Sequence, residues 1–194
     1  MTDEPAFEGV HFQEILTKEP LKEATFFCQG SSSMLFERGD RLYRLTLEGC
    51  GHNFLAQQSA EGNRNVVEII HDYGAVGPSD SSLPGSASEF YWLAQVERLA
   101  SVDETSEPLL AGILSGLLDE NDDLPADCVL SEQCWALADE YPDLAGVLIT
   151  LAKSAEFAER HEGNVDAKLD NIMRRPATGD LVWTDPLGGC LYEP

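Results

Sequence analysis

Positively charged residues are scarce in this chain. Only 12 of its 194 residues are Lys or Arg, against 35 Asp or Glu, which gives a formal net charge of −23. A surface this negative repels the phosphates of nucleic acids and of anionic lipids. We therefore expect no direct nucleic-acid partner and no membrane partner.

Long hydrophobic runs are also missing. No stretch approaches the roughly 18 apolar residues of a membrane-spanning helix, and the acidic start MTDEPAFEGV is unlike a secretory signal. These absences predict a cytoplasmic protein. Hydrophobic residues make up 43% of the chain, close to a globular average, so the acidity does not indicate disorder.

Several motifs of common enzymes are absent. Five cysteines, an odd number without a CxxC pair, predict reduced thiols rather than a disulfide framework or a structural zinc site. The chain has no HExxH, no GxSxG and no Walker-A loop. A zinc hydrolase, a serine hydrolase of the elbow type and a P-loop ATPase are therefore disfavoured.

The first half of the chain reads as β-rich. Short alternating apolar segments predict five strands, and one segment of helical composition follows the third. The predicted strands are residues 24–30, 33–40, 41–49, 66–74 and 89–99, with the helix at 52–60. A segment rich in Gly, Pro and Ser, residues 74–88, is predicted as a flexible loop.

The second half reads as helical and acidic. Helices are predicted at residues 109–118, 131–141 and 142–161, with Ser131 as the cap of the second. Trp92, Trp135 and Trp183 are expected in the core. No basic residue lies between Arg98 and Lys153, whereas 12 acidic residues fall between 103 and 143. Such a run is usually a solvated helix face.

A β-hairpin is predicted near the C-terminus, with strands at residues 171–175 and 181–185. If Arg175 pairs with Leu181, Asn171 lies opposite Asp185, with Cβ atoms roughly 4.5–5.5 Å apart. An amide oxygen and a carboxylate are hard ligands that suit Mg²⁺. The register therefore predicts a metal site at the end of this hairpin.

The same residues carry a resemblance to protein kinases. The sequence Asp166-Ala-Lys168-Leu-Asp-Asn171, followed by the hairpin and Asp185, resembles the family's catalytic and metal-binding loops, and is most similar to the early Ser/Thr kinase of short-tailed bacteriophages. The resemblance implies an α+β, two-lobe fold. Residues 1–24 would be an extension, 25–100 a five-stranded antiparallel N-lobe with one helix, and 101–194 a reduced helical C-lobe.

The resemblance also implies roles for individual residues. Asp166 would orient the attacking hydroxyl, Lys168 would lie against the transferred phosphoryl group, and Asn171 and Asp185 would hold Mg²⁺ on ATP. The nucleotide would contact the turn between the first two strands, the third strand and the connector after the fifth. These nucleotide-binding positions are Gly30, Ser31, Ser32, Ser33, Arg44, Glu97 and Leu99.

The chain departs from the kinase pattern in ways that favour a second hypothesis. Arg44 stands where the family has Lys, and the following helix offers Gln57 and Gln58 but no early Glu to pair with it. The chain ends nine residues after Asp185, which predicts that no lobe for a protein substrate follows.

Two functions therefore remain open. The first is an ATP- and Mg²⁺-dependent phosphotransferase acting on Ser/Thr of host proteins, in the host cytoplasm if a phage encodes it. The second is a catalytically degenerate acidic protein that binds and inhibits a basic, nucleic-acid-binding host protein. The sequence does not set the oligomeric state.

Overall fold

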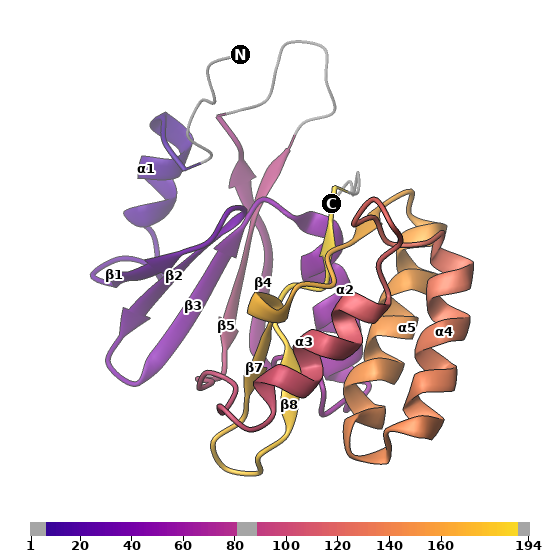
Figure 1. Cartoon of the computed structure of the whole chain (residues 1–194). Coiled ribbons are helices and arrows are strands. Elements are labelled where there is room, and N and C mark those ends of the chain that lie inside the picture. Colours follow the sequence, from indigo (N-terminus) through magenta and orange to yellow (C-terminus); the bar gives the residue numbers. More distant parts are fainter. Residues whose placement is uncertain (1–6, 81–88, 190–194) are drawn as a thin grey trace.

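The computed structural model describes residues 7–80 and 89–189 and has a mixed α+β architecture (Figure 1). Five antiparallel strands form one sheet in the order β1-β2-β3-β5-β4, which confirms the predicted sheet. The strands are β1 (Thr25–Gln29), β2 (Ser33–Arg38), β3 (Arg41–Thr46), β4 (Ile69–Pro78) and β5 (Phe90–Val96). The turn between β2 and β3 contains Gly39, whose φ of 64° suits glycine.

The alternation of side chains along β3 divides the sheet into two faces. Tyr43 and Leu45 point into a core that includes α1 (Val10–Leu16), whereas Leu42 packs in the core beneath α2 (Gly49–Ala60). Because successive strand residues point to opposite faces, Arg44 shares the face of Leu42. Arg44 is thereby buried on the side of the sheet that faces the rest of the chain.

The second half of the chain packs its helices around a separate apolar core. The elements are α3 (Glu107–Gly116), α4 (Asp127–Glu140), the short η1 (Pro142–Leu144) and α5 (Ala145–Arg160). Leu110, Leu130 and Leu151 contribute to this core from α3, α4 and α5. Of the helices within the described ranges, none combines the length and hydropathy that a bilayer crossing requires.

A hairpin joins the two halves. It consists of β7 (Ile172–Arg174) and β8 (Leu181–Trp183), and Gly179, with a φ of 81°, helps to close its turn. Trp183 is fully buried and its Nε1 donates a hydrogen bond of 2.9 Å to the carbonyl of Val147 in α5. On its other side the hairpin exchanges backbone hydrogen bonds of 2.8 and 2.9 Å between Arg174 and Ala100.

The structure corrects several predicted boundaries. β4 continues to Pro78, because it pairs with β5 as far as Phe90, so the first part of the predicted loop 74–88 is strand; residues 81–88 lie outside the described residues. The predicted cap Ser131 lies inside α4, where its hydroxyl is 3.0 Å from Glu156 of α5. Helix α1 was not predicted.

Two predictions about side chains are wrong. Cys50 takes part in a disulfide bond, whereas Cys28, Cys128 and Cys134 are free as predicted. Trp135 was predicted in the core, but 44% of it is exposed on α4. Helix periodicity alone does not show which apolar residues lie beyond the edge of the buried face.

Candidate active site

One cavity of about 400 Å³ lies where the sheet meets the hairpin and the loops beside it. Every site residue predicted from the sequence lines this cavity. From the sheet and the connector after it come Gly30, Ser31, Ser32, Ser33, Arg44, Glu97 and Leu99; from the second half come Asp166, Lys168, Asn171 and Asp185. The structure therefore brings these positions together, while their roles stay predictions.

Short strand pairs hold the two loops of the second half against each other. β6 (Asn164–Val165) pairs antiparallel with β9 (Leu187–Gly188), and the backbone N–H of Asp166 donates to the carbonyl of Pro186 at 2.9 Å. The segment after β6 thus begins beside the segment before β9. This pairing places Asp166 and Asp185 on the same cavity.

The predicted hairpin register is wrong by one residue. Arg174, not Arg175, pairs with Leu181, and Arg175 N–H instead bonds to the carbonyl of Asp180. Asn171 consequently faces Thr184, whose N–H donates to the Asn171 carbonyl at 2.8 Å. Asp185 lies one residue beyond the pair, on the same cavity as Asn171.

Asp166 is positioned by two neighbours. Lys168 Nζ lies 2.9 Å from Asp166 Oδ1, and Asn171 Nδ2 donates to Asp166 Oδ2 at 3.1 Å and to its carbonyl at 3.0 Å. The hydrogen bond and charge of Asp166 raise the pKa of Lys168, so this amine stays protonated. An oriented carboxylate beside a cation is suited to hold a hydroxyl near a phosphoryl group.

Arg44 and Asp185 form an ion pair across the cavity. Arg44 Nη2 lies 2.9 Å from Asp185 Oδ1, with side-chain exposures of only 8% and 18%. Within the described residues, neither atom has a partner with hydrogen-bonding geometry, although both are buried. The pair is therefore held by charge, and both atoms keep unused bonding capacity in a cavity.

The serine-rich turn covers the same carboxylate. It closes through a backbone hydrogen bond of 2.8 Å from Gly30 N–H to the Ser33 carbonyl. Ser32 Oγ points toward Asp185 Oδ2 at 3.5 Å, while the Ser32 carbonyl accepts from Thr46 Oγ1 at 2.9 Å. The turn is thus anchored on β3 and directs a hydroxyl at Asp185.

Glu48 is a neighbour of this pair that the sequence reasoning missed. It directly precedes α2, which begins three residues earlier than predicted, and its Oε2 accepts a hydrogen bond of 3.1 Å from Gly189 N–H. Burial, and then the charge of Asp185, raise the pKa of Glu48. An acidic residue directly before Gly-Cys-Gly at a strand-to-helix turn was the available signal.

The other half of the cavity is apolar. Phe27, which is half exposed, lies at its edge, and the Arg98 guanidinium lies 5.7 Å from the Phe27 ring centroid. The remaining apolar lining consists of Leu35, Leu42, Val67, Val96, Leu99 and Met173. An apolar compartment beside a polar one suits a planar base joined to phosphates.

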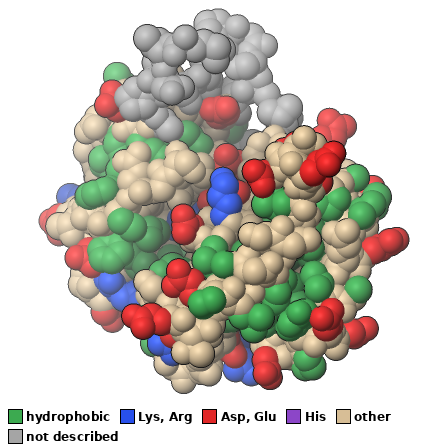
Figure 2. Space-filling model, viewed as in Figure 1, with side chains coloured by type: hydrophobic (Ala, Val, Ile, Leu, Met, Phe, Trp, Pro, Cys, Tyr) green, Lys and Arg blue, Asp and Glu red, His purple; other side chains and the backbone are tan. Residues whose placement is uncertain are grey.

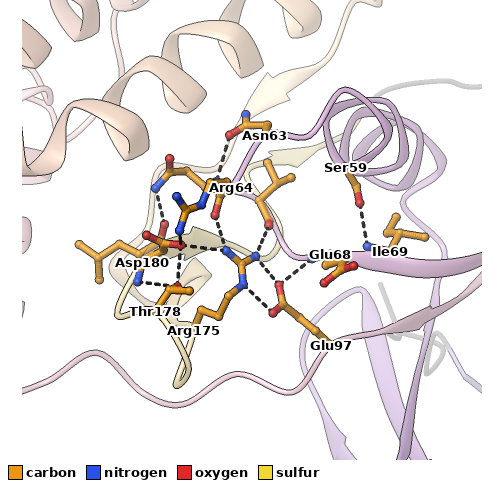
Figure 3. Close-up of polar contacts among 12 residues, drawn as sticks. Ser59, Asn63, Arg64, Glu68, Ile69, Glu97, Arg175, Thr178 and Asp180 are labelled. Atoms are coloured by element: carbon orange, nitrogen blue, oxygen red, sulfur yellow. Dashed lines mark hydrogen bonds and ion pairs between the residues drawn. The ribbon is translucent and has the colours of Figure 1, made fainter.

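Glu97 lines the cavity, but its carboxylate is already bound. Arg175 Nε donates to Glu97 Oε2 at 2.7 Å, Arg175 Nη2 bonds Oε1, and Glu68 N–H donates to Oε1 at 2.8 Å (Figure 3). Hence any nucleotide contact at this position falls to the backbone or to the aliphatic part of the side chain.

The cavity offers a small set of ligands for Mg²⁺. Among the described residues, no three His, Cys, Asp or Glu side chains converge in the manner of a preformed metal centre. Mg²⁺ on a nucleotide needs only one or two protein ligands, because phosphates and water complete its octahedron. Two oxygens fit that requirement. One is the buried Asp185 Oδ1, which accepts no hydrogen bond from the part of the chain that the structure describes. The other is Asn171 Oδ1, whose amide nitrogen is turned to Asp166.

A second cavity, of about 640 Å³, adjoins the first and shares Asp166 and Lys168 with it. Its other wall is the acidic connection between α3 and α4. That wall includes Leu118, Asp122, Asp123, Leu124, Pro125 and Asp127. Burial and the nearby Glu159 raise the pKa of Asp127, so a cation bound there would relieve an unfavourable negative charge.

Comparison with known proteins gives little. No protein-family model matches the chain, and the search of curated proteins finds no similar sequence. Among solved structures the chain is similar to a thermostable mutant of the aminoglycoside phosphotransferase APH(4)-Ia, crystallised in a ternary complex with AMP-PNP and hygromycin B. The identity is 13% and the TM-score 0.34, over 91% of this chain and 72% of that one. A likeness at this TM-score establishes neither a fold family nor an activity.

Proposed function

We propose that the protein is a compact kinase-like phosphotransferase that moves the γ-phosphoryl group of ATP to a hydroxyl group. The observation that carries the proposal is the meeting of Asp166, Lys168, Asn171 and Asp185 on one cavity with Arg44 and the serine turn. The sheet with α2 would be the N-lobe and the helices with the hairpin the reduced C-lobe. The base would occupy the apolar half of the cavity, which leaves the phosphates on the polar half.

The residues divide the catalytic work by position. Asp166 would hold the acceptor hydroxyl, and Lys168 would neutralise charge on the transferred group. Asp185 and the amide oxygen of Asn171 would hold Mg²⁺, which supplies charge neutralisation on the phosphates when bound.

We further propose that the acceptor is a Ser or Thr of a host protein with a basic surface. The second cavity supports this choice, because it shares Asp166 and Lys168 with the first cavity and has acidic residues on its wall. Figure 2 shows Asp and Glu scattered widely over one face of the molecule, with few Lys or Arg among them. A basic segment would be attracted over a long distance by such a surface.

A specific observation favours the second candidate, a kinase-fold acidic binding protein without catalysis. The carboxylate expected to hold the metal is paired with Arg44, which replaces the family's Lys. If the Arg44–Asp185 ion pair does not separate, Asp185 cannot bind a metal and the cavity has no catalytic role. The acidic residues between 103 and 143 in the helical half would then bind the basic partner without catalysis.

Phosphate transfer separates the two candidates. The protein is incubated with γ-labelled ATP, Mg²⁺ and basic peptides containing Ser or Thr, beside the variants Asp166→Asn and Asp40→Asn. Asp40 lies exposed in the turn after β2 and away from the cavity, so its variant controls for the loss of one carboxylate. We expect labelling that Asp40→Asn retains and Asp166→Asn loses by at least about a hundredfold. Absence of labelling together with basic-peptide binding would favour the second candidate.

A further inference from the structure

The cavity contains an internal substitute for the divalent cation. Arg44 Nη2 lies 2.9 Å from Asp185 Oδ1, the oxygen that is best placed to hold a metal. We infer that Arg44 occupies the metal position in the nucleotide-free protein, and that the phosphates of the nucleotide must draw Arg44 away before a divalent cation can bind to Asp185. The inference rests on the proposed nucleotide site.

The first support is the poor geometry of the pair. Arg44 is more than nine-tenths buried, yet its Nη2 lacks a properly oriented acceptor among the described residues, and Asp185 Oδ1 lacks a donor. A structural arginine in such a place would normally bond bidentately to its carboxylate. Both groups therefore retain a bond that a ligand can complete, and Arg44 keeps an N–H available on the cavity.

The second support is the mutual exclusion of the two cations. Mg²⁺ binds carboxylate oxygen at about 2.0–2.1 Å. A guanidinium nitrogen at 2.9 Å from the same oxygen would leave two like charges in close contact inside a buried site. The Asp185 carboxylate can therefore bind either the Arg44 guanidinium or the divalent cation, but not both at once.

The third support is the way the segments around the pair are packed. A Cβ added at Gly51 of α2 would lie 3.1 Å from Asp185 Oδ1 and 3.2 Å from the Leu187 carbonyl. Asp185 therefore lies close against α2, which blocks its movement in that direction. Arg44, with its long side chain, is the partner that can turn toward phosphate.

The consequence is an order of binding. A nucleotide offers Arg44 several phosphate oxygens in exchange for one carboxylate oxygen, and the exchange frees Asp185 for the cation. The bare protein should thus bind divalent cations weakly, and removal of the guanidinium should create metal binding. This gain of binding is opposite to what a purely structural ion pair predicts.

The test measures Mn²⁺ binding to the protein without nucleotide, by electron paramagnetic resonance of the free ion. We compare the wild type with Arg44→Gln, with the double variant Arg44→Gln/Asp185→Asn, and with Arg64→Gln. Arg64 is a matched control, since its Nη2 also lies 2.9 Å from an aspartate, Asp180, but away from the cavity. We expect Arg44→Gln to bind Mn²⁺ at least about tenfold more tightly than the wild type, the double variant to lose that gain, and Arg64→Gln to behave as wild type.

A separate titration keeps this inference apart from the proposed function. A fluorescent ATP analogue is added to the wild type in EDTA and then with Mn²⁺. If the analogue binds while Arg44→Gln gains no Mn²⁺ affinity, the inference is wrong and the proposed function stands. If the wild type binds no analogue under either condition, the proposed function is overturned together with the inference. Should Arg44→Gln not fold, Arg44→Lys replaces it, with an expected smaller gain; unchanged Mn²⁺ binding in that variant would equally overturn the inference.

Discussion

Two arginines of this protein lie at the junction between sheet and helices, and they are bonded very differently. Arg175 bonds to both carboxylate oxygens of Glu97 and also donates to the carbonyls of Arg64 and Val66, at 2.7 and 3.2 Å (Figure 3). Among the described residues, Arg44 has one ion pair, with Asp185, and its Nη2 makes no hydrogen bond of good geometry.

We take the difference to separate a structural pair, Arg175 with Glu97, from the pair that we propose to be functional, Arg44 with Asp185. Arg175 uses its planar fork to join the hairpin to the segment before β4 and to the end of β5, and every one of these bonds is made within the protein. Arg44 lies on a cavity and leaves bonding capacity unused. Stability should therefore depend on Arg175, and binding chemistry on Arg44 and Asp185.

The largest effect on stability is expected from Arg175→Met. This variant leaves the Glu97 carboxylate, only 13% exposed, without its cation, and removal of one partner from such a buried pair costs about 3–5 kcal/mol. The free energy of unfolding from urea denaturation should fall by that amount. Arg64→Met, whose side chain is 68% exposed, is the control, with a change expected within about 0.5 kcal/mol. Equal losses of unfolding free energy in the two variants would show that Arg175 contributes no more to stability than an exposed arginine does.

The next effect concerns catalysis. Under the proposed function, Asp185→Asn should lower the rate of phosphate transfer at least about a hundredfold, because a neutral amide is a poor metal ligand and does not balance the charge of Arg44. The free energy of unfolding should also fall, because Asn leaves the buried Arg44 guanidinium without its counter-charge. The loss should be smaller than in Arg175→Met, since among the described residues the Arg44 Nη2 and Asp185 Oδ1 atoms make no well-formed hydrogen bond. Asp180→Asn, at the Arg175 cluster, is the matched substitution and should retain the rate. A large stability loss in Asp185→Asn with an unchanged rate of phosphate transfer would show that the Arg44–Asp185 pair is structural rather than functional.

A smaller effect is expected from glycines in two helices. Gly51→Ala places a Cβ at 3.1 Å from Asp185 Oδ1 and 3.2 Å from a carbonyl oxygen, so these neighbours must give way by a few tenths of an ångström, at a cost of about 1–3 kcal/mol. In α3, a Cβ added at Gly112 has no described residue within 4 Å outside its own helix turn, so Gly112→Ala should instead stabilise by up to about 1 kcal/mol. Thermal unfolding of both variants gives the comparison. Stabilisation by Gly51→Ala would show that Asp185 is not confined by α2.

The smallest effect is a pH dependence of the Arg175 cluster. The hydroxyl of Thr178, followed by the charges of Arg64 and Arg175, holds the pKa of Asp180 below its ordinary value of 3.8. A carboxyl group whose pKa is lowered on folding stabilises the protein above the unfolded pKa and loses that contribution as the pH falls through the folded pKa. Stability should therefore decline below about pH 4 more steeply in the wild type than in Asp180→Asn. If the stability of the wild type and of Asp180→Asn falls in parallel as the pH is lowered, the Asp180 carboxylate does not contribute to the stability of this cluster.

Most of the sheet and the grouping of the site could be predicted from sequence. Strand alternation and turn residues are local signals, so the order of five strands and a helix followed from them. The hairpin register was wrong by one residue, because the turn from 176 to 180 can be closed by more than one pairing. The actual pairing is fixed by Trp183, which is buried against α5 and is bonded to the carbonyl of Val147.

The missed members of the site have a common cause. Phe27 and Met173 carry no motif, and they reach the cavity only because distant strands and loops pack around it. The commitment of the Glu97 carboxylate to Arg175 joins residues 78 positions apart. Such long-range contacts leave no local pattern in the chain.

The sequence by itself determined the charge, the alternation of the strands and the spacing of Asp166, Lys168 and Asn171. These are properties of composition and of neighbouring residues, which short-range sterics and solvation act upon directly. Only the tertiary structure decided that Arg44 pairs with Asp185 and Arg175 with Glu97. Each of these pairings depends on which face of a strand is buried and on which distant segment covers it, and the folded core sets both.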